Sequence, residues 1–474
     1  METLQRTANR GSISTGYDID NSLKLEADNT EYLYKTNDAG TNRKTFTVSM
    51  WFKRTELADD YMTLWQGGSN GEATRLGFYG GTPKEAIWVD IGGGTGNTGT
   101  LYRSYSNQVL RDTSAFYHIV LAVDTTQATE ANRFRLWLNG EEVISWSQRQ
   151  YPVQDFECAV EASVNMNWGA YDATYYKMCG YIAECHYLDG VTAVQTDFGE
   201  YDEDSGIWKP KAYAGSYGDN GCYLNFDDSA SLGADSSGNS NTFTLNNITS
   251  ADQATDTPTN NFAVLNTISA TSTVLDATEG ATFLSNNDGS ISWQTISATI
   301  GVTSGKWYWE NQKNSNTGNF FSGIAASDDP ALRTANLLGA TSEGSSIAFQ
   351  YSNNSIANGS GSFTMVSGEI MMFALDMDNG ALYFGKQGTW QNSSDPTSGA
   401  SKTGASTLWS SFDDKIVLPA LQAFQNNQIF TNFGGYSSYA ISSAASDANG
   451  YGTFEYAPPT GYYALCTKNL AEFG

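Results

Sequence analysis

The chain has few charged residues, few histidines and no long apolar runs, and each shortage excludes a class of protein. Only 16% of the 474 residues are charged and two are histidines, which nearly rules out histidine-based catalysis and His-rich metal centres. No stretch approaches the roughly 18 apolar residues of a membrane span, and the N-terminus lacks the apolar core of a signal peptide. We therefore expect a protein that folds in the cytosol and does not insert into membranes.

Positive charge is scarce as well. The sequence has 25 Lys and Arg against 51 Asp and Glu, a formal net charge of −26 with a pI near 4.3. A field of that sign repels phosphate backbones and anionic lipid surfaces. We expect no nucleic-acid partner, and we interpret the acidity mainly as a source of solubility.

The cysteines are too few and too scattered to build a metal site or a disulfide framework. Their number is odd and no CxxC pair occurs. We expect reduced, buried thiols at all five positions, which are Cys158, Cys179, Cys185, Cys222 and Cys466.

Glycine, serine, threonine, asparagine and aromatic residues are abundant, as many short strands joined by tight turns require. Residues 45–54 alternate with a period of two, with Phe46, Val48, Met50 and Phe52 on one face. Neither helical periodicity nor heptads appear over any long stretch. The sequence predicts an all-β protein with helix content below about a tenth, set against the ordinary third.

Two Asn-Gly pairs mark β-hairpins. Asn139-Gly140 lies between the expected strands 134–138 and 141–143, and Asn379-Gly380 separates the apolar runs 370–375 and 381–384. Both residues of such a pair tolerate positive φ, which makes Asn-Gly between apolar runs a strong hairpin signal.

The first half of the chain carries three motifs in order. They are "TVSMWFK", "FYHIVLAVD" and "LWLNGEEV", followed by residues 180–184. This set resembles the laminin-G-like branch of the concanavalin-type jelly rolls over residues 20–225. The resemblance implies a β-sandwich that binds sugars or proteins, in a group whose related jelly rolls include glucanases.

The second half carries a different set. It comprises "SGKWYWE" (304–310), residues 368–384, "LPAL" (418–421) and "TNFG" (431–434). These segments resemble the SPRY (B30.2-like) fold over roughly the last 210 residues. The resemblance implies a second sandwich that presents loops to a partner. We expect the ring cluster Trp307-Tyr308-Trp309 to pack in its core.

We therefore predict two antiparallel, jelly-roll-like β-sandwich domains joined by a turn-rich connector. The predicted parts are an N-terminal arm (1–17), a laminin-G/concanavalin-like sandwich (18–225), the connector (226–265) and a SPRY-like sandwich (266–474). The apolar residues after Pro458 and Pro459 predict a final packed strand.

The joined pattern resembles the laminin-G-plus-SPRY proteins of tailed phages. That resemblance implies a non-enzymatic virion protein, assembled in the host cytoplasm, that acts as a tail fibre, receptor-binding appendage or capsid decoration. It would bind host-surface glycan or protein through sandwich loops and form a homo-oligomer, for which we favour a trimer. The short, weakly basic arm 1–17 would contact other virion proteins. The alternatives are a jelly-roll glycoside hydrolase and a SPRY-type protein-binding adaptor.

Two loop segments are candidates for ligand binding, since an exposed ring beside amides suits the face of a sugar. They contribute Trp65 and Gln66 in the first half and Trp390, Gln391 and Asn392 in the second. A packed turn is the competing interpretation of both.

A possible calcium site lies in the predicted connector. Hard oxygen ligands gather around a glycine turn there, and the candidate residues are Asp227, Asp235, Ser237, Asn239 and Asn241. The spacing is not that of an EF-hand, and Asx turns explain the same residues. We predict no other cofactor.

Catalysis is not expected. Retaining glycosidases need two carboxylates about 5 Å apart, and the nearest string in this sequence is Glu200-Tyr201-Asp202-Glu203-Asp204. It lacks the final glutamate of the glucanase motif, and its glycine and serine neighbours predict a solvated acidic turn. His118, inside an apolar run, is interpreted as a packed core residue.

Overall fold

A computed structural model describes residues 16–474 apart from 39–41, 58–59, 69–72, 95–98, 161–162, 272–274, 287–291, 315–319, 335, 341–344 and 425–426. The described chain forms two compact units, Ser14–Thr259 and Asn260–Gly474. Both are built from antiparallel sheets, and the one α-helix among the described residues is α2 (Thr467–Phe473). The prediction of an all-β chain with β-sandwich folds is confirmed.

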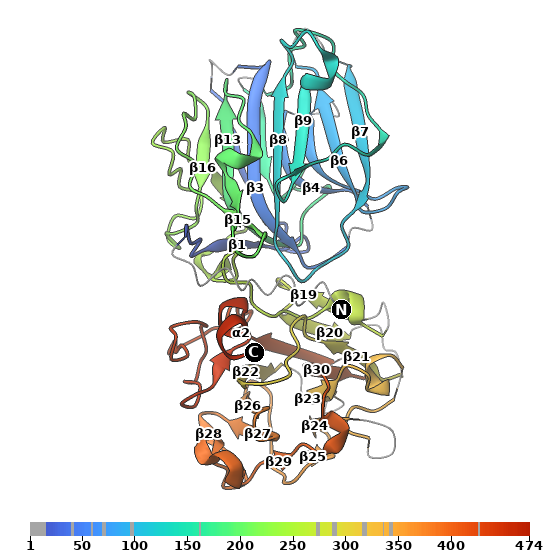
Figure 1. The fold of residues 1–474 in the computed structure, drawn as a ribbon, viewed down its shortest axis with the longest axis vertical. Coiled ribbons are helices and arrows are strands. Elements are labelled where there is room, and N and C mark those ends of the chain that lie inside the picture. The colour runs from blue at the N-terminus through green and yellow to red at the C-terminus, as the bar shows by residue number, and fades with distance from the viewer. Residues whose placement is uncertain are drawn as a thin grey trace. The chain divides into compact units, whose positions relative to one another are not determined.

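The first unit has two eight-stranded sheets (Figure 1). The strands of its first sheet, in chain order, are β1 (Ser22–Leu25), β3 (Thr45–Arg54), β8 (Tyr117–Asp124), β9 (Phe134–Leu138), β10 (Glu141–Glu142), β13 (Gly180–Asp189), β16 (Cys222–Leu224) and β18 (Gln253–Ala254). Their spatial order is β10-β9-β8-β3-β13-β1-β18, with β16 also paired to β13.

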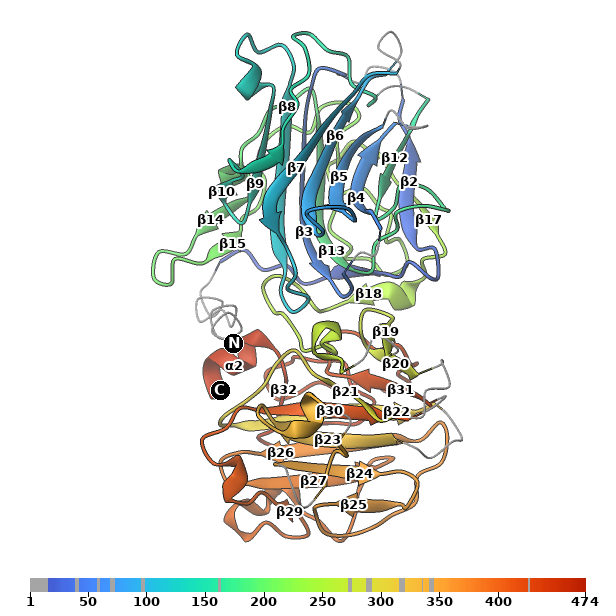
Figure 2. The ribbon, with the colours of Figure 1, turned by 90° about the vertical axis from the view of Figure 1, so that its right-hand side faces the viewer.

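The strands of the second sheet of this unit have the order β11-β7-β6-β5-β4-β12-β2-β17. Figure 2 shows those from β7 to β17 side by side. The strands of this sheet are β2 (Tyr32–Thr36), β4 (Met62–Gly67), β5 (Thr74–Tyr79), β6 (Ala86–Gly92), β7 (Leu101–Val109), β11 (Trp146–Gln148), β12 (Asn165–Trp168) and β17 (Thr244–Asn246). A separate hairpin pairs β14 (Gly199–Tyr201) with β15 (Trp208–Pro210).

The core of the first unit lies between its two sheets. Strand β3 matches the predicted residues 45–54, and its alternate apolar side chains Phe46, Val48, Met50 and Phe52 are fully buried in that core. The Asn139-Gly140 turn has positive φ at both residues and closes the β9–β10 hairpin. Both predictions are confirmed.

The opposite face of β3 is also buried, which the alternation did not predict. His118 and Trp208 pack near Trp51, and the Lys53 ammonium is 2.8 Å from the Asp256 carboxylate. Later segments of the chain therefore cover the face that a two-layer sandwich would leave to water.

The segment predicted as a connector supplies strands to the first unit as far as Thr259. β17 pairs with β2, and β18 pairs with β1. The Lys24 ammonium lies 2.8 Å from the Asp252 carboxylate just before β18. These pairings and the ion pair attach the segment to both sheets of the unit.

The second unit also has two main sheets (Figure 2). The larger contains β19 (Asp276–Thr278), β20 (Phe283–Asn286), β22 (Lys306–Lys313), β26 (Ile370–Asp376), β27 (Ala381–Lys386), β28 (Thr389–Trp390), β29 (Ser406–Thr407), β31 (Asn427–Asn432) and β32 (Tyr463–Ala464). The smaller contains β21 (Gln294–Ser297), β23 (Phe320–Ala326), β24 (Ser346–Gln350), β25 (Ser355–Ala357) and β30 (Val417–Ala423).

Short 3-10 turns join many of the strands in both units. They are η1 (Glu130–Asn132), η2 (Gln195–Asp197), η3 (Ser250–Asp252), η4 (Thr267–Ser269), η5 (Pro330–Leu332), η6 (Pro396–Ser401) and η7 (Ser410–Phe412).

The aromatic run on β22 is buried, as expected. Trp307, Tyr308 and Trp309 are at most 1% exposed, and the Trp309 ring stacks on Phe373 of β26. The predicted hairpin between residues 370 and 384 is the β26–β27 pair, with Gly380 at positive φ in its turn.

The chain end combines the predicted final strand with a short helix. Tyr463 and Ala464 pair in parallel with β22, Cys466 bridges Phe262, and residues 467–473 then form α2. The helix explains the apolar residues as well as a strand would, because Tyr463 stacks on Phe473 with ring centroids 3.8 Å apart. The predicted final strand is present as the short strand β32, and α2 follows it.

All five cysteines are free and buried, as predicted. Of the predicted arm 1–17, residues 1–15 lie outside the described part of the chain. Tyr17 is described, and its hydroxyl donates to the Glu184 carboxylate at 2.7 Å.

Candidate functional site

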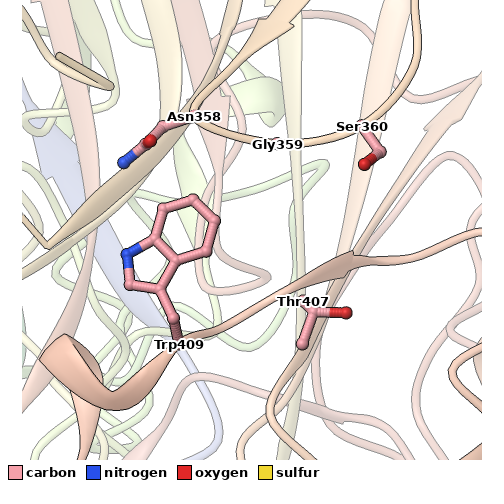
Figure 3. A pocket seen from close by; sticks show the side chains of 5 residues that line it. All are labelled: Asn358, Gly359, Ser360, Thr407 and Trp409. Carbon is pink, nitrogen blue, oxygen red and sulfur yellow. The ribbon is translucent and has the colours of Figure 1, made fainter. Parts of the chain in front are cut away.

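An open hollow of about 390 Å³ lies on the second unit. Its lining residues are Asn358, Gly359, Ser360, Thr407 and Trp409 (Figure 3). Trp409 is 40% exposed, which is unusual for a tryptophan in this chain, and Figure 3 shows its indole extending toward the 358–360 segment. A large exposed ring beside polar groups marks the hollow as a candidate ligand site.

One wall of the hollow is the turn that follows β25. Asn358 has a φ of 59°, and its side-chain amide donates to the Ser346 carbonyl at 2.9 Å. A Cβ on Gly359 would lie 2.5 Å from both Ile356 and Ser406, so only glycine fits there without displacement. The Ser360 N–H donates to the Ser406 hydroxyl at 3.1 Å, which fixes the turn against β29.

The other wall follows β29, whose residue Thr407 pairs with Ala381 of β27. Trp409 then precedes the short turn η7, where Phe412 is buried and its N–H donates to the Trp409 carbonyl at 2.9 Å. The backbone is thus held by packing and hydrogen bonds while the indole remains accessible.

The lining groups favour binding over chemistry. Described residues of the hollow offer an indole, a carboxamide and two hydroxyls, and none of those side chains ionises near neutral pH. Such a set can stack on an apolar ring face and exchange hydrogen bonds with hydroxyl or amide groups of a ligand. It supplies neither a general base nor a nucleophile of lowered pKa.

The sequence reasoning missed Trp409 but contained the signal that could have found it. Trp409 stands between Leu408 and Ser410-Ser411, outside any alternating apolar run. The same criterion, a ring beside small polar residues, was applied instead to two other tryptophans.

The structure corrects the expected position of Trp65. It lies inside strand β4 rather than in a loop, and its ring is fully buried against Tyr187, with centroids 5.8 Å apart. Gln66 is 3% exposed, and its amide donates to the Tyr171 carbonyl at 2.7 Å. The expectation of an exposed ring was wrong, because Trp65 lies in a strand whose six residues are all buried.

Trp390, Gln391 and Asn392 follow the β27–β28 turn. Trp390 is half-buried against the aromatic cluster of this unit, while Asn392 is exposed at a φ of 57°. Asn392 packs closely over Gly361, the residue after Ser360. The structure thus brings Asn392 beside the hollow, and ligand binding by this turn stays a prediction.

The predicted calcium ligands form a network of hydrogen bonds among themselves and with the backbone. The Asp235 carboxylate accepts from the N–H groups of Tyr223, Ser237 and Asn241, at 2.9, 2.9 and 2.7 Å. The side-chain amides of Asn239 and Asn241 donate to the Gly221 carbonyl. These bonds are those of an Asx-type turn, the other interpretation of the loop.

Asp227 lies apart from that turn in its hydrogen bonding. Its carboxylate accepts from the amides of Asn21 and Asn225. Calcium binding by the five residues stays a prediction.

The carboxylates considered for glycoside hydrolysis are held by a lysine. Glu200 lies in β14 rather than in the loop expected, and Asp202 follows the strand. The Lys209 ammonium lies 3.5 Å from Glu200 and 3.3 Å from Asp202. Hydrogen bonds from the Ser205 backbone and hydroxyl lower the pKa of Asp202 to about 2, the reverse of what a general acid needs.

Both histidines are buried in packed surroundings. The Trp208 indole N–H donates to His118 Nδ1 at 3.0 Å, and burial lowers the pKa of His118 to about 3. His186 stacks on Tyr223 with ring centroids 4.4 Å apart.

One group of metal-type side chains went unnoticed in the sequence. Glu26, Glu56 and Cys179 place one ligand atom each within 4.8 Å of one another. Cys179 donates to Glu26 at 3.2 Å, and burial raises the pKa of its thiol well above the ordinary value. The thiol therefore carries its proton at neutral pH.

The helices in the described part of the chain are all too short or too polar to span a membrane.

One comparison with known families matches part of the first unit. Residues 28–172 match the family described as the Concanavalin A-like lectin/glucanases superfamily (Laminin_G_3). The match supports the concanavalin-type jelly roll expected for this part of the chain.

Solved structures similar to the chain include two SPRY domains. The SPRY domain of human HERC1 is 16% identical, with 35% of this chain and 96% of that domain covered at a TM-score of 0.26. The TRIM65 PSpry domain is 12% identical, with 36% and 91% covered at a TM-score of 0.27. A search of curated proteins found no match.

Proposed function

We propose that the chain is a non-enzymatic recognition protein whose second unit binds a neutral glycan in the hollow around Trp409. The observation that carries this proposal is an indole 40% exposed beside one carboxamide and two hydroxyls. A pyranose ring offers an apolar face for the indole and hydroxyls for the polar rim. Asn392 lies against Gly361, the residue after Ser360 of the lining.

A glycan array with the parent and three variants tests the proposal. Trp409→Ala should weaken binding at least about tenfold, because removing an aromatic anchor costs more than 1.4 kcal/mol. Trp409→Phe should recover part of it. Tyr175→Ala is the matched control, since Tyr175 is 56% exposed on the first unit. Equal binding by the parent and Trp409→Ala would refute the site.

A protein ligand is the second candidate for the same hollow, since indole, amide and hydroxyl groups also suit a peptide turn. This candidate is the adaptor-type function. It predicts that a protein from the target surface binds the parent after deglycosylation, and that Trp409→Ala loses that binding. A ligand sensitive to deglycosylation favours the glycan.

The proposal includes a setting on the virion of a tailed phage, as tail fibre, receptor-binding appendage or capsid decoration. It rests on the order of sequence segments around and between the two sandwiches. Mass spectrometry of purified particles should detect the chain. Deletion of residues 2–17 should leave a folded protein that no longer joins particles, and analytical ultracentrifugation should give a trimer.

A non-enzymatic role also predicts the outcome of an activity assay. The parent should not hydrolyse laminarin-like β-glucans. Hydrolysis that is lost in both Glu200→Gln and Asp202→Asn would establish the glucanase function instead.

A further inference from the structure

A buried lysine faces two carboxylates at the edge of the first unit. Lys24 of β1 is 1% exposed, and its ammonium lies 2.9 Å from Glu31 and 2.8 Å from Asp252. The strand register pairs Leu23 with Gln253 and Ser22 with Ala254. Lys24 and Asp252 are therefore the next cross-strand neighbours in that antiparallel register.

Burial makes the charge of this cluster costly. One ammonium between two carboxylates leaves a net negative charge out of water, which is unfavourable. Burial accordingly raises the pKa of Glu31 to about 7. Near neutral pH the Glu31 carboxyl is therefore protonated in a large share of molecules and can exchange a proton with its neighbours.

The Asp252 carboxyl is oriented by a separate pair of donors. One of its oxygens, Oδ2, accepts from the Thr249 N–H at 2.7 Å and from the Thr249 hydroxyl at 3.1 Å. The other oxygen, Oδ1, faces the Lys24 ammonium. Two donors fixed on one oxygen are the arrangement that stabilises an oxyanion when a nucleophile attacks the carboxyl carbon.

We propose that Lys24 and Asp252 form an intramolecular isopeptide bond, with Glu31 as the proton carrier. The ion pair first exchanges a proton to give a neutral amine and a carboxylic acid. The Nζ lone pair of Lys24 attacks Cγ of Asp252, and negative charge develops on Oδ2 against Thr249. Glu31 takes a proton from Nζ and gives one to Oδ1, the C–Oδ1 bond breaks, and one water leaves. The step needs no oxidant, reductant or cofactor.

The contact between the reacting groups favours this reaction. Amide formation from separate molecules in water is unfavourable, but reacting groups held in contact have effective molarities of about 10⁵ M or more. Burial also excludes the water that would hydrolyse the product. The bond would join β1 to the residue before β18, the first and last strands of the unit.

A second buried pair serves as an internal reference. Lys53 and Asp256 lie 2.8 Å apart and are at most 1% exposed. They show whether contact between a buried lysine and an aspartate is enough for the reaction. The proposal assigns the bond to Lys24 and Asp252, where Glu31 and Thr249 flank the reacting atoms.

Intact-mass measurement on the unfolded, reduced full chain tests the proposal. The parent should be lighter than its sequence by one water molecule. Asp252→Asn should lose one ammonia molecule instead, so the two cross-linked proteins should have the same mass. Lys24→Arg should retain its full sequence mass, as should Glu31→Gln if it folds. Peptide mapping should recover a branched peptide that joins Lys24 to residue 252.

Each other outcome counts against the proposal. A folded parent at its full sequence mass overturns it. A water loss that maps to Lys53 and Asp256 overturns the assignment, and a bond that persists in folded Glu31→Gln overturns the role of Glu31. Should Glu31→Gln fail to fold, the mass of Asp252→Asn still decides whether the bond forms.

Discussion

Two buried sites, one in each unit, hold charge in different ways. In the first unit, described buried cations contact carboxylates, as in the Lys53–Asp256 pair at 2.8 Å and the Arg54–Glu85 pair at 2.6 Å. In the second unit, the carboxylate of Glu310 is buried among neutral donors. It accepts from the hydroxyls of Tyr308 and Tyr439 and from the N–H groups of Glu455 and Tyr456, at 2.8 to 3.0 Å.

The ion pair and the hydrogen-bonded carboxylate each attach a different segment to its sheet. The ion pair Lys53–Asp256 ties a late segment to the outer face of β3, and removal of one partner leaves a buried charge. Glu310 ties the 439–456 segment to β22 by hydrogen bonds from donors that are themselves uncharged. The first arrangement should therefore be the more sensitive to loss of one group.

Lys53→Met should have the largest effect. It leaves Asp256 buried without its cation, so the free energy of unfolding of the first unit should fall by about 3–5 kcal/mol. Lys44→Met is the matched control, because the Lys44–Asp155 pair is partly exposed and such pairs contribute about 1 kcal/mol or less. Urea unfolding followed by tryptophan fluorescence measures both. Equal losses would contradict the contrast drawn between buried and exposed pairs.

Two hairpin glycines, one in each unit, allow a second comparison of stability. Gly140 and Gly380 both have positive φ. A Cβ added to Gly140 would lie 2.4 Å from the Trp208 ring, whereas a Cβ added to Gly380 would have its nearest neighbouring atom 3.7 Å away. Gly140→Ala should cost about 2–4 kcal/mol, from backbone strain and overpacking together. Gly380→Ala should cost about 1–2 kcal/mol from strain alone. Thermal unfolding that ranks them the other way would show that Trp208 moves freely.

Glu310→Gln should lower the free energy of unfolding of the second unit by about 1–3 kcal/mol, because the new amide N–H₂ faces donors instead of acceptors. It should also change the pH dependence. Burial raises the pKa of Glu310, with the hydrogen bonds opposing it, so the folded carboxyl holds its proton more tightly than the unfolded one. Its stabilisation is present below the ordinary glutamate pKa and is lost as pH rises through the raised value. The difference in unfolding midpoint between parent and variant should become smaller as pH rises through the raised pKa. A difference that stays constant with pH would contradict a raised pKa of Glu310.

The smallest effect on stability is expected at the hollow. Trp409→Ala should change the free energy of unfolding by less than about 0.5 kcal/mol, as exposed substitutions do, while it weakens ligand binding at least about tenfold. Circular dichroism melts run beside the binding assay separate the two. A large loss of stability would show that the indole is a packing residue.

Local pattern predicted the elements well where neighbours in sequence decide them. Strand β3 and the turns at Gly140 and Gly380 follow from alternation and from the need for positive φ. The exposure of single side chains did not follow. Trp65 and the outer face of β3 are buried by segments more than a hundred residues away, and no local period records such contacts.

The candidate site shows the same limit. Asn392 was predicted and lies beside the hollow, yet Trp409 was missed and Trp65 was misplaced. A ring beside amides identifies a type of recognition group, whereas its accessibility depends on how β25, β29 and η7 meet. That meeting is a property of the tertiary fold.

The pairing of β1 with β18 brings the two ends of the first unit together. Its entry and exit strands run antiparallel and adjacent, so both ends leave the sheet at one edge. A domain with neighbouring ends can be inserted into a surface loop of another protein, or circularly permuted, with little added linker. We expect the gene segment for residues 16–259 to work as a cassette: grafted into an unrelated host protein, it should fold without disturbing the host.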